Sequence, residues 1–171
     1  MLAGDIDCFG LLVDKYQSKV LGMIYNMTRD RHLSEDLCQD VFMDAYRSLA
    51  NFDSARSRFS TWLYRITQNK AINALRKHKP LLFAEVPERA IEAGGFETIA
   101  AEELHIEIDR ILDRLPARQK AAFVWSEIEE LSYKEIAEIE GVSLGTIKSR
   151  ISRAKRFLQD AVKHRKAISN E

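Results

Sequence analysis

The chain has 171 residues, of which 46% are hydrophobic and 30% are charged, and its formal net charge is zero. This size allows one ordinary domain or two small ones, and the composition is that of a globular protein. No stretch approaches the ~20 apolar residues that a membrane span needs, and the N-terminus MLAGDID lacks a signal-peptide pattern, so we expect a cytoplasmic protein without membrane insertion.

Apolar residues recur at helical spacing along most of the chain, whereas Gly and Pro number only seven and three. We therefore predict an all-α fold. A first helix carries apolar residues from Phe9 to Met27. A second helix begins with Ser34 as its N-cap and turns Leu37 and Val41 inward.

The outer face of this second helix combines acidic and polar side chains with a large apolar one near its edge: Asp36, Gln39, Asp40 and Phe42. Such a mixture is typical of a protein-docking surface. An ordinary solvated acidic face would show the same pattern, and these residues alone leave the two interpretations equal.

Residues 52–59 form a polar loop between aromatics, and a helix capped by Ser60 or Thr61 follows it. Trp62 and Ile66 suit a core, whereas the exposed side would carry Arg65, Asn69, Asn73, Arg76 and Lys77. Aromatics interleaved with amides and cations can stack single-stranded bases, bond their edges and hold their phosphates. The alternative is that the aromatics are only core and the cations only surface.

An acidic bias, two prolines and paired glycines mark residues 80–101, and we predict that residues 81–101 are a flexible interdomain linker. The predicted architecture is therefore two small helical domains, over residues 1–80 and 102–171. In the second domain one helix ends at Pro116 and another covers about residues 117–130.

Residues 131–158 predict a helix-turn-helix. Gly141 falls where the chain reverses, Val142 fills the turn, and Ser143 is a good N-cap for the next helix. That helix has a buried stripe beginning at Ile147 and Ile151. Its other face carries short hydroxyls and long cations, which suit base edges and phosphates, at Thr146, Lys148, Ser149, Arg150, Ser152 and Arg153. A solvated basic face is the alternative.

The charge distribution favours the DNA-binding interpretation. Residues 52–79 hold seven bases and one acid (net +6), residues 81–113 two bases and nine acids (net −7), and residues 143–166 eight bases and one acid (net +7). Two basic blocks separated by an acidic one indicate two polyanion-binding surfaces with a spacer that avoids DNA.

Nothing in the sequence marks an enzyme. The histidines have no metal-ligand spacing, there is no Gly-rich phosphate loop, and no nucleophile is paired with a base, so we expect no catalytic residue, metal or cofactor. Cys8 and Cys38 lie among apolar neighbours and are interpreted as buried thiols in a reducing compartment.

Five segments in order resemble the bacterial sigma factors: GD-x-x-x-F, ED-L-x-Q-D-V-F, F-x-T-W-L-x-R-I-x-x-N, L-P-A-R-Q-x-x-x-F, and L-S-Y-x-E-I-A-E-x-x-G-V-S-x-G-T-I-K-S-R-I-x-R-A. The size is similar to that of the extracytoplasmic-function (ECF) group of the sigma-70 family, whose members often serve stress responses. The resemblance covers nearly the whole chain apart from the linker and tail.

The resemblance implies a transcription initiation factor that binds core RNA polymerase through the β′ clamp helices and the β flap, and is held by an anti-sigma factor. It assigns the clamp-helix contact to Asp36, Gln39, Asp40 and Phe42, and recognition of melted −10 DNA to Phe52, Arg65, Asn69, Asn73, Arg76 and Lys77. Phe52 and Asn69 would line a pocket for a flipped base. Asn73 departs from the family, where many relatives have Asp.

In the second domain the resemblance assigns −35 recognition to Thr146, Lys148, Ser149, Ser152 and Arg153, with Arg150 on a phosphate. The competing hypothesis is a stand-alone regulator with a sensory helical domain, which would bind a palindromic site as a dimer. That hypothesis leaves the TWLYRI stretch unexplained.

Overall fold

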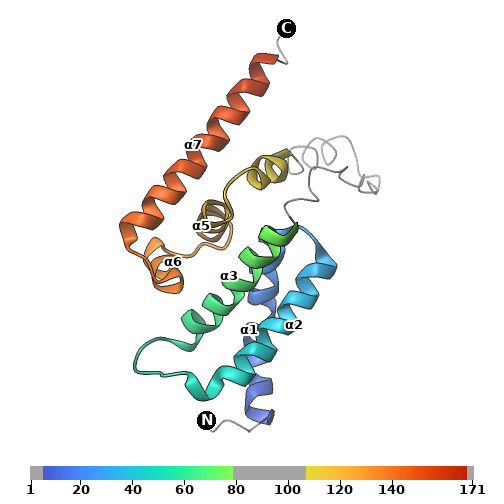
Figure 1. The fold of residues 1–171 in the computed structure, drawn as a ribbon, viewed down its shortest axis with the longest axis vertical. Helices are drawn as coiled ribbons and strands as arrows, with labels where there is room; N and C mark the ends of the chain where they lie inside the picture. Colours follow the sequence, from blue (N-terminus) through green and yellow to red (C-terminus); the bar gives the residue numbers. More distant parts are fainter. Residues whose placement is uncertain (1–5, 79–106, 169–171) are drawn as a thin grey trace.

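The computed structural model describes residues 6–78 and 107–168 (Figure 1). They form α1 (Ile6–Thr28), α2 (Arg31–Ser48), the 3₁₀ turn η1 (Leu49–Asn51), α3 (Phe59–His78), α5 (Ala117–Glu127), α6 (Tyr133–Glu140) and α7 (Leu144–Ile168), with a further helical stretch at residues 107–113. No strand occurs in these two ranges, and the predicted all-α fold is confirmed. The predicted linker and both domain boundaries lie outside them.

Helices α1, α2 and α3 pack side by side in the N-terminal half (Figure 1). Their apolar faces meet in a cluster formed by Phe9, Val20, Ile24, Cys38, Val41, Phe42, Ala45 and Leu63. The predicted inward face of α2 is confirmed at Val41, which is fully buried, as is Ala45 one turn later.

Two helix starts differ from the predicted caps. The N-cap of α2 is Asp30, whose carboxylate accepts a hydrogen bond from the Leu33 amide at 3.0 Å. Asp caps as well as Ser does, so the helix begins earlier and Ser34 is buried in its first turn, where its hydroxyl donates to the Asp30 carbonyl. Helix α3 likewise begins at Phe59, ahead of the hydroxyls of Ser60 and Thr61.

Aromatic packing explains the early start of α3. The Phe59 ring lies 5.6 Å from that of Phe52, 5.5 Å from that of Trp62 and 5.5 Å from that of Tyr16, measured between ring centroids. These contacts anchor Phe59 in the N-terminal half, so the first turn of α3 is fixed by ring packing rather than by a hydroxyl cap.

The helix-turn-helix is confirmed in α6 and α7. The hydroxyl of Ser132 accepts from the Glu135 amide while the Glu135 carboxylate accepts from the Ser132 amide, which makes a reciprocal capping box at the start of α6. Gly141 ends the helix with φ +66°, in the left-handed region that a residue without Cβ adopts easily. Ser143 caps α7 by accepting from the Thr146 amide at 3.2 Å.

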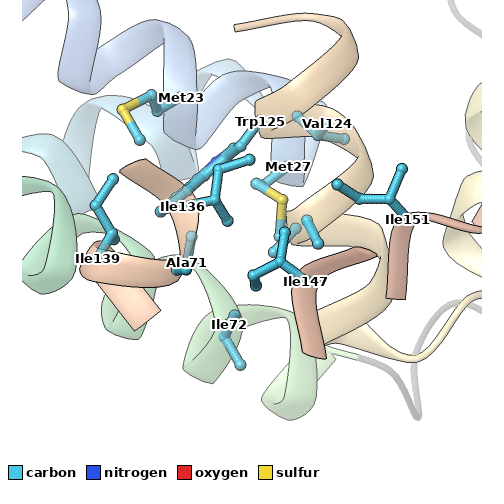
Figure 2. Close-up of a cluster of buried hydrophobic side chains, with 13 residues drawn as sticks. Met23, Met27, Ala71, Ile72, Val124, Trp125, Ile136, Ile139, Ile147 and Ile151 are labelled. Carbon is cyan, nitrogen blue, oxygen red and sulfur yellow. The ribbon is translucent and has the colours of Figure 1, made fainter. Parts of the chain in front are cut away.

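The largest buried cluster joins the two halves of the chain (Figure 2). Met23 and Met27 of α1 and Ala71 and Ile72 of α3 contribute from the N-terminal half. From the C-terminal half come Ala121, Ala122, Val124 and Trp125 of α5, Ile136, Ala137 and Ile139 of α6, and Ile147 and Ile151 of α7. The described halves therefore share one core.

Polar contacts surround this shared core. The Lys19 ammonium lies 2.7 Å from the Glu129 carboxylate, whose other oxygen accepts from the Asn26 amide at 2.7 Å. Lys120 is buried and donates to the Met27 carbonyl at 2.6 Å. Further contacts between the halves are Arg29 with Asp109, and Arg65 with the carbonyls of Glu138 and Ile139. The contact between the halves is thus specific as well as apolar.

Candidate nucleic-acid interface

The first three turns of α7 bring most of the predicted −35 residues together. Lys148, Ser152 and Arg153 are exposed, whereas Thr146 and Ser149 are half-buried. They lie away from the fully buried stripe that holds α7 against the rest of the molecule, formed by Ile147, Ile151 and Ala154. Hydroxyls and cations therefore share one accessible side of a helix whose other side is fixed by packing.

A shallow hollow of about 410 Å³ lies on this side of α7, lined by Tyr133, Lys148, Ile151, Ser152, Lys155, Arg156 and Gln159. Lys155 pairs with Glu127 at 3.0 Å, and the hydrogen bond to this carboxylate raises the pKa of Lys155. The ammonium of Lys155 therefore stays charged, but it is already paired with α5. Lys148 and Arg156 supply the other two cations of the hollow.

Arg150 differs from Lys148 and Ser152 because it is engaged by a side chain of α6. Its guanidinium pairs with the carboxylate of Glu140, the last residue of α6, and Glu140 also lies 3.4 Å from the guanidinium of Arg118. The Glu140 side chain is completely buried. Sequence reasoning missed Glu140, because a charged residue at a helix end is usually solvated.

On α3 the predicted −10 residues Asn69, Asn73, Arg76 and Lys77 are all exposed. Three of them, Asn69, Asn73 and Lys77, line a groove of about 890 Å³ between α2 and α3, together with Asn51, Lys70 and eight other residues. Asn51 and Lys70 were not predicted. The sequence pattern could not indicate these two residues, because it did not show that the end of α2 lies against α3.

The remaining two predicted −10 residues lie elsewhere. The Phe52 ring packs against Phe59 and Trp62 at the start of α3 and does not line the groove. Arg65 is exposed but its guanidinium donates to the carbonyls of Ile139 at 2.9 Å and Glu138 at 2.7 Å. The groove between α2 and α3 therefore includes Asn69 but neither Phe52 nor Arg65.

On α2, Asp36, Gln39 and Asp40 are exposed, which a docking face and a solvated acidic face both require. Phe42 is buried in the α1–α2–α3 cluster, because its ring turns toward the core rather than the edge. Met43, half exposed, is the large apolar side chain that this face presents.

An ion-pair cluster links α2 to the groove. Lys70 lies 2.9 Å from the carboxylate of Asp44 and 3.4 Å from that of Asp40. The hydrogen bond to Asp44 raises the pKa of the Lys70 ammonium, and partial burial acts in the opposite direction. The acidic face of α2 and the amide-rich side of α3 thus meet at Lys70.

Within residues 6–78 and 107–168, no group of three or more His, Cys, Asp or Glu side chains is placed to hold a metal ion. Across the same ranges, no helix has the length and apolar character to cross a membrane.

Two family models match this chain, one over the residues that carry the α2 and α3 faces and one over those that carry the α7 face. Residues 12–80, which include α2 and α3, match Sigma-70 region 2, and residues 105–158, which include α5, α6 and the start of α7, match Sigma-70 region 4. The proteins of solved structure share the fold. CnrH, solved in complex with the cytosolic domain of CnrY, superposes with a TM-score of 0.70 over 94% of this chain and 91% of that one, at 24% identity. The sigma factor RpoE of Bartonella quintana, solved with the anti-sigma factor NepR, gives 0.67 over 92% and 98%, at 25% identity.

Three sequence relatives are sigma factors that this chain matches over most of their length. The ECF RNA polymerase sigma factor SigW of Bacillus subtilis is 34% identical over 91% of this chain and 89% of its own. RNA polymerase sigma-H factor of Pseudomonas aeruginosa is 35% identical over 93% and 88%, and the ECF sigma-E factor of Escherichia coli is 34% identical over the same shares. The chain therefore belongs to the ECF RNA polymerase sigma factors of the sigma-70 family.

Proposed function

We propose that this chain binds core RNA polymerase and directs it to promoters by reading a −35 element with α7 and a melted −10 element with α3. The observation that supports this most directly is that each of the two family regions carries one accessible face of amides, hydroxyls and cations suited to binding nucleic acid. The chain would act in the cytoplasm and catalyse no reaction, because its relatives are initiation factors rather than enzymes.

At the −35 element, the start of α7 would enter the major groove. Lys148 and Arg153 are exposed and long enough to reach base edges or phosphates, while Thr146, Ser149 and Ser152 are short enough to let the helix approach closely. The buried contacts of Ile147 and Ile151 would hold the helix at a fixed angle to the rest of the domain.

At the −10 element, α3 would hold one strand of melted DNA. The side-chain amides of Asn69 and Asn73 offer donors and acceptors for base edges, and Arg76 and Lys77 would hold phosphates. Unstacking a base costs a few kcal/mol, which such contacts can offset without any chemistry. We retain Phe52 and Arg65 in this proposal, but each must leave its present partners to reach the strand.

The α2 face would dock on the β′ clamp helices through Asp36, Gln39 and Asp40, with Met43 as the apolar contact. Phe42 would support this face from beneath, since it is buried. The C-terminal half would contact the β flap. We also propose an anti-sigma partner, because the RpoE relative was solved with one.

The described arrangement of the two halves cannot serve both promoter elements at once. The centres of the −35 and −10 elements are 25 base pairs apart, which is about 85 Å of straight duplex. The two faces lie closer together than this, because Arg65 of α3 bonds the Ile139 carbonyl. Even a fully extended path from the Asn69 side chain through Arg65 and Ile139 to the Lys148 side chain measures less than about 60 Å. We infer that the two halves separate before the chain binds a promoter, which fits their assignment to two domains.

Run-off transcription tests the proposal. Bacterial core polymerase would be supplied with a library of promoter fragments, with and without this protein. New specific transcripts that share −35 and −10 sequences are the expected result. Neither transcripts nor polymerase binding, together with binding of the protein alone to a palindromic duplex, would overturn it in favour of a stand-alone regulator.

A further inference from the structure

The ion pair between Glu140 and Arg150 connects the two helices of the helix-turn-helix across their turn. Glu140 ends α6 and Arg150 lies in the second turn of α7. The Glu140 side chain is completely buried, whereas that of Arg150 is 19% exposed. Arg118 of α5 contacts the same carboxylate oxygen, so three helices meet at one buried charge.

A buried carboxylate is tolerated only when cations or hydrogen-bond donors compensate it. In the part of the chain that the structure describes, the second oxygen of Glu140 accepts no hydrogen bond. Both guanidinium contacts fall on the first oxygen. The side chain of Arg118 is 45% exposed, so the closer and more buried partner, Arg150, carries most of the compensation.

The helical geometry places Arg150 at the border between the accessible side of α7 and its buried stripe. At about 100° per residue, Arg150 points roughly 160° from both Lys148 and Ser152, about 40° from Thr146, and about 60° from both Arg153 and the buried Ile147. The side chain therefore lies at the margin of the buried stripe, next to α6. An arginine held there cannot approach the phosphates that Lys148 approaches unless its ion pair breaks.

We propose that Glu140 is a positioning residue for promoter recognition, and that Arg150 acts through Glu140 instead of contacting DNA. The pair fixes the rotation of α7 against α6, and this rotation sets which side chains face the base edges. The inference rests on the proposed −35 reading by α7, and it replaces the phosphate contact that the sequence assigned to Arg150.

The salt dependence of promoter binding separates positioning from phosphate contact. Holoenzyme assembled from core polymerase and the full chain would be titrated onto a selected promoter at several salt concentrations, with Arg150→Gln compared with Lys148→Gln. Loss of a phosphate contact lowers the slope of log K against log[salt] by about 0.9. We expect this change for Lys148→Gln only, whereas Arg150→Gln weakens binding with an unchanged slope. A slope lowered equally by Arg150→Gln would overturn the inference.

A double replacement keeps the test valid if single variants are poorly folded. Apolar residues of similar volume often replace a buried ion pair without loss of stability. We expect Glu140→Leu alone to weaken −35 binding at least tenfold, which corresponds to a loss of about 1.4 kcal/mol. The double variant Glu140→Leu with Arg150→Met should recover −35 binding to within about threefold of wild type. Melting curves report folding of each variant.

A double variant that folds but stays as weak as Arg150→Gln would contradict the positioning role, because it would show that the guanidinium itself is needed on the DNA. Wild-type holoenzyme that selects no promoter would be a different failure, since it would overturn the proposed function and the −35 role of this pair with it.

Discussion

Replacing Glu129 with Gln should loosen the contact between the two halves without disturbing either one. The Glu129 side chain is only 7% exposed, although it follows α5 in a short loop. Its carboxylate contacts Lys19 at 2.7 Å and Asn26 at 2.7 Å, both on α1. Gln keeps the size of the side chain and an oxygen for Asn26, but removes the charge that faces Lys19.

The expected effect is moderate. The Lys19 side chain is 38% exposed, so solvent screens the pair, and the lost charge-assisted contact contributes about 1 kcal/mol. A change of this size raises the ratio of separated to packed molecules about fivefold. It leaves the apolar contacts of Met23 and Met27 with Trp125 in place, so the packed form still dominates.

Exchange of the Trp125 indole proton measures this ratio directly. The Trp125 side chain is completely buried in the shared core, and its Nε1–H has no hydrogen-bond partner among the described residues (Figure 2). Solvent reaches it when the halves separate, so by NMR its exchange should accelerate about fivefold in Glu129→Gln. Glu127→Gln is the matched control, because Glu127 pairs with Lys155 within the C-terminal half. Equal acceleration in both variants would show that exchange follows unfolding of the half itself, and would refute the reasoning.

Three further predictions concern the helix-turn-helix. Ser132→Ala removes the capping box and should lower the free energy of unfolding by about 1 kcal/mol. Because the Ser132 hydroxyl lowers the pKa of Glu135, this difference between variant and wild type is present above the ordinary Glu pKa of about 4.3 and shrinks as pH falls below it. Urea melts at pH 7 and pH 3 would show the change. Gly141→Ala meets no atom within 4 Å but keeps φ +66°, so it should cost about 1 kcal/mol in the same melts, and no loss would mean that the turn rearranges. Ile136→Ala should cost about 2–5 kcal/mol by calorimetry, since the side chain is fully buried, and a loss below 1 kcal/mol would contradict its place in the core.

Local signals made the helix-turn-helix predictable. Gly141 and Ser143 mark a turn and a cap within a few residues, and the spacing of Ile147 and Ile151 defines a buried stripe without reference to any partner. The cap of α2 was predicted wrongly at Ser34 because Asp30, four residues earlier, satisfies the same orphan amides equally well.

Contacts between distant segments could not be predicted in this way. Periodicity shows that Met27 and Ile72 are apolar positions, but it does not show that Trp125 covers them. The burial of Glu140 depends on two arginines, ten residues later and twenty-two residues earlier in the chain. Phe42 was placed near the edge of α2 because helical spacing leaves a residue at the border of the apolar face ambiguous, and packing against α1 and α3 decided the outcome.

Promoter selection by variant holoenzymes tests the division of labour between α7 and α3 most directly. Wild type, Arg153→Gln and Asn69→Ala would each be assembled with core polymerase, and each would select active promoters from a library randomised at both elements. We predict that Arg153→Gln relaxes the preference at the −35 positions only, and that Asn69→Ala relaxes it at the −10 positions only. The contrary result is that both variants change the same element, or that neither changes any preference while the yield of transcript falls uniformly.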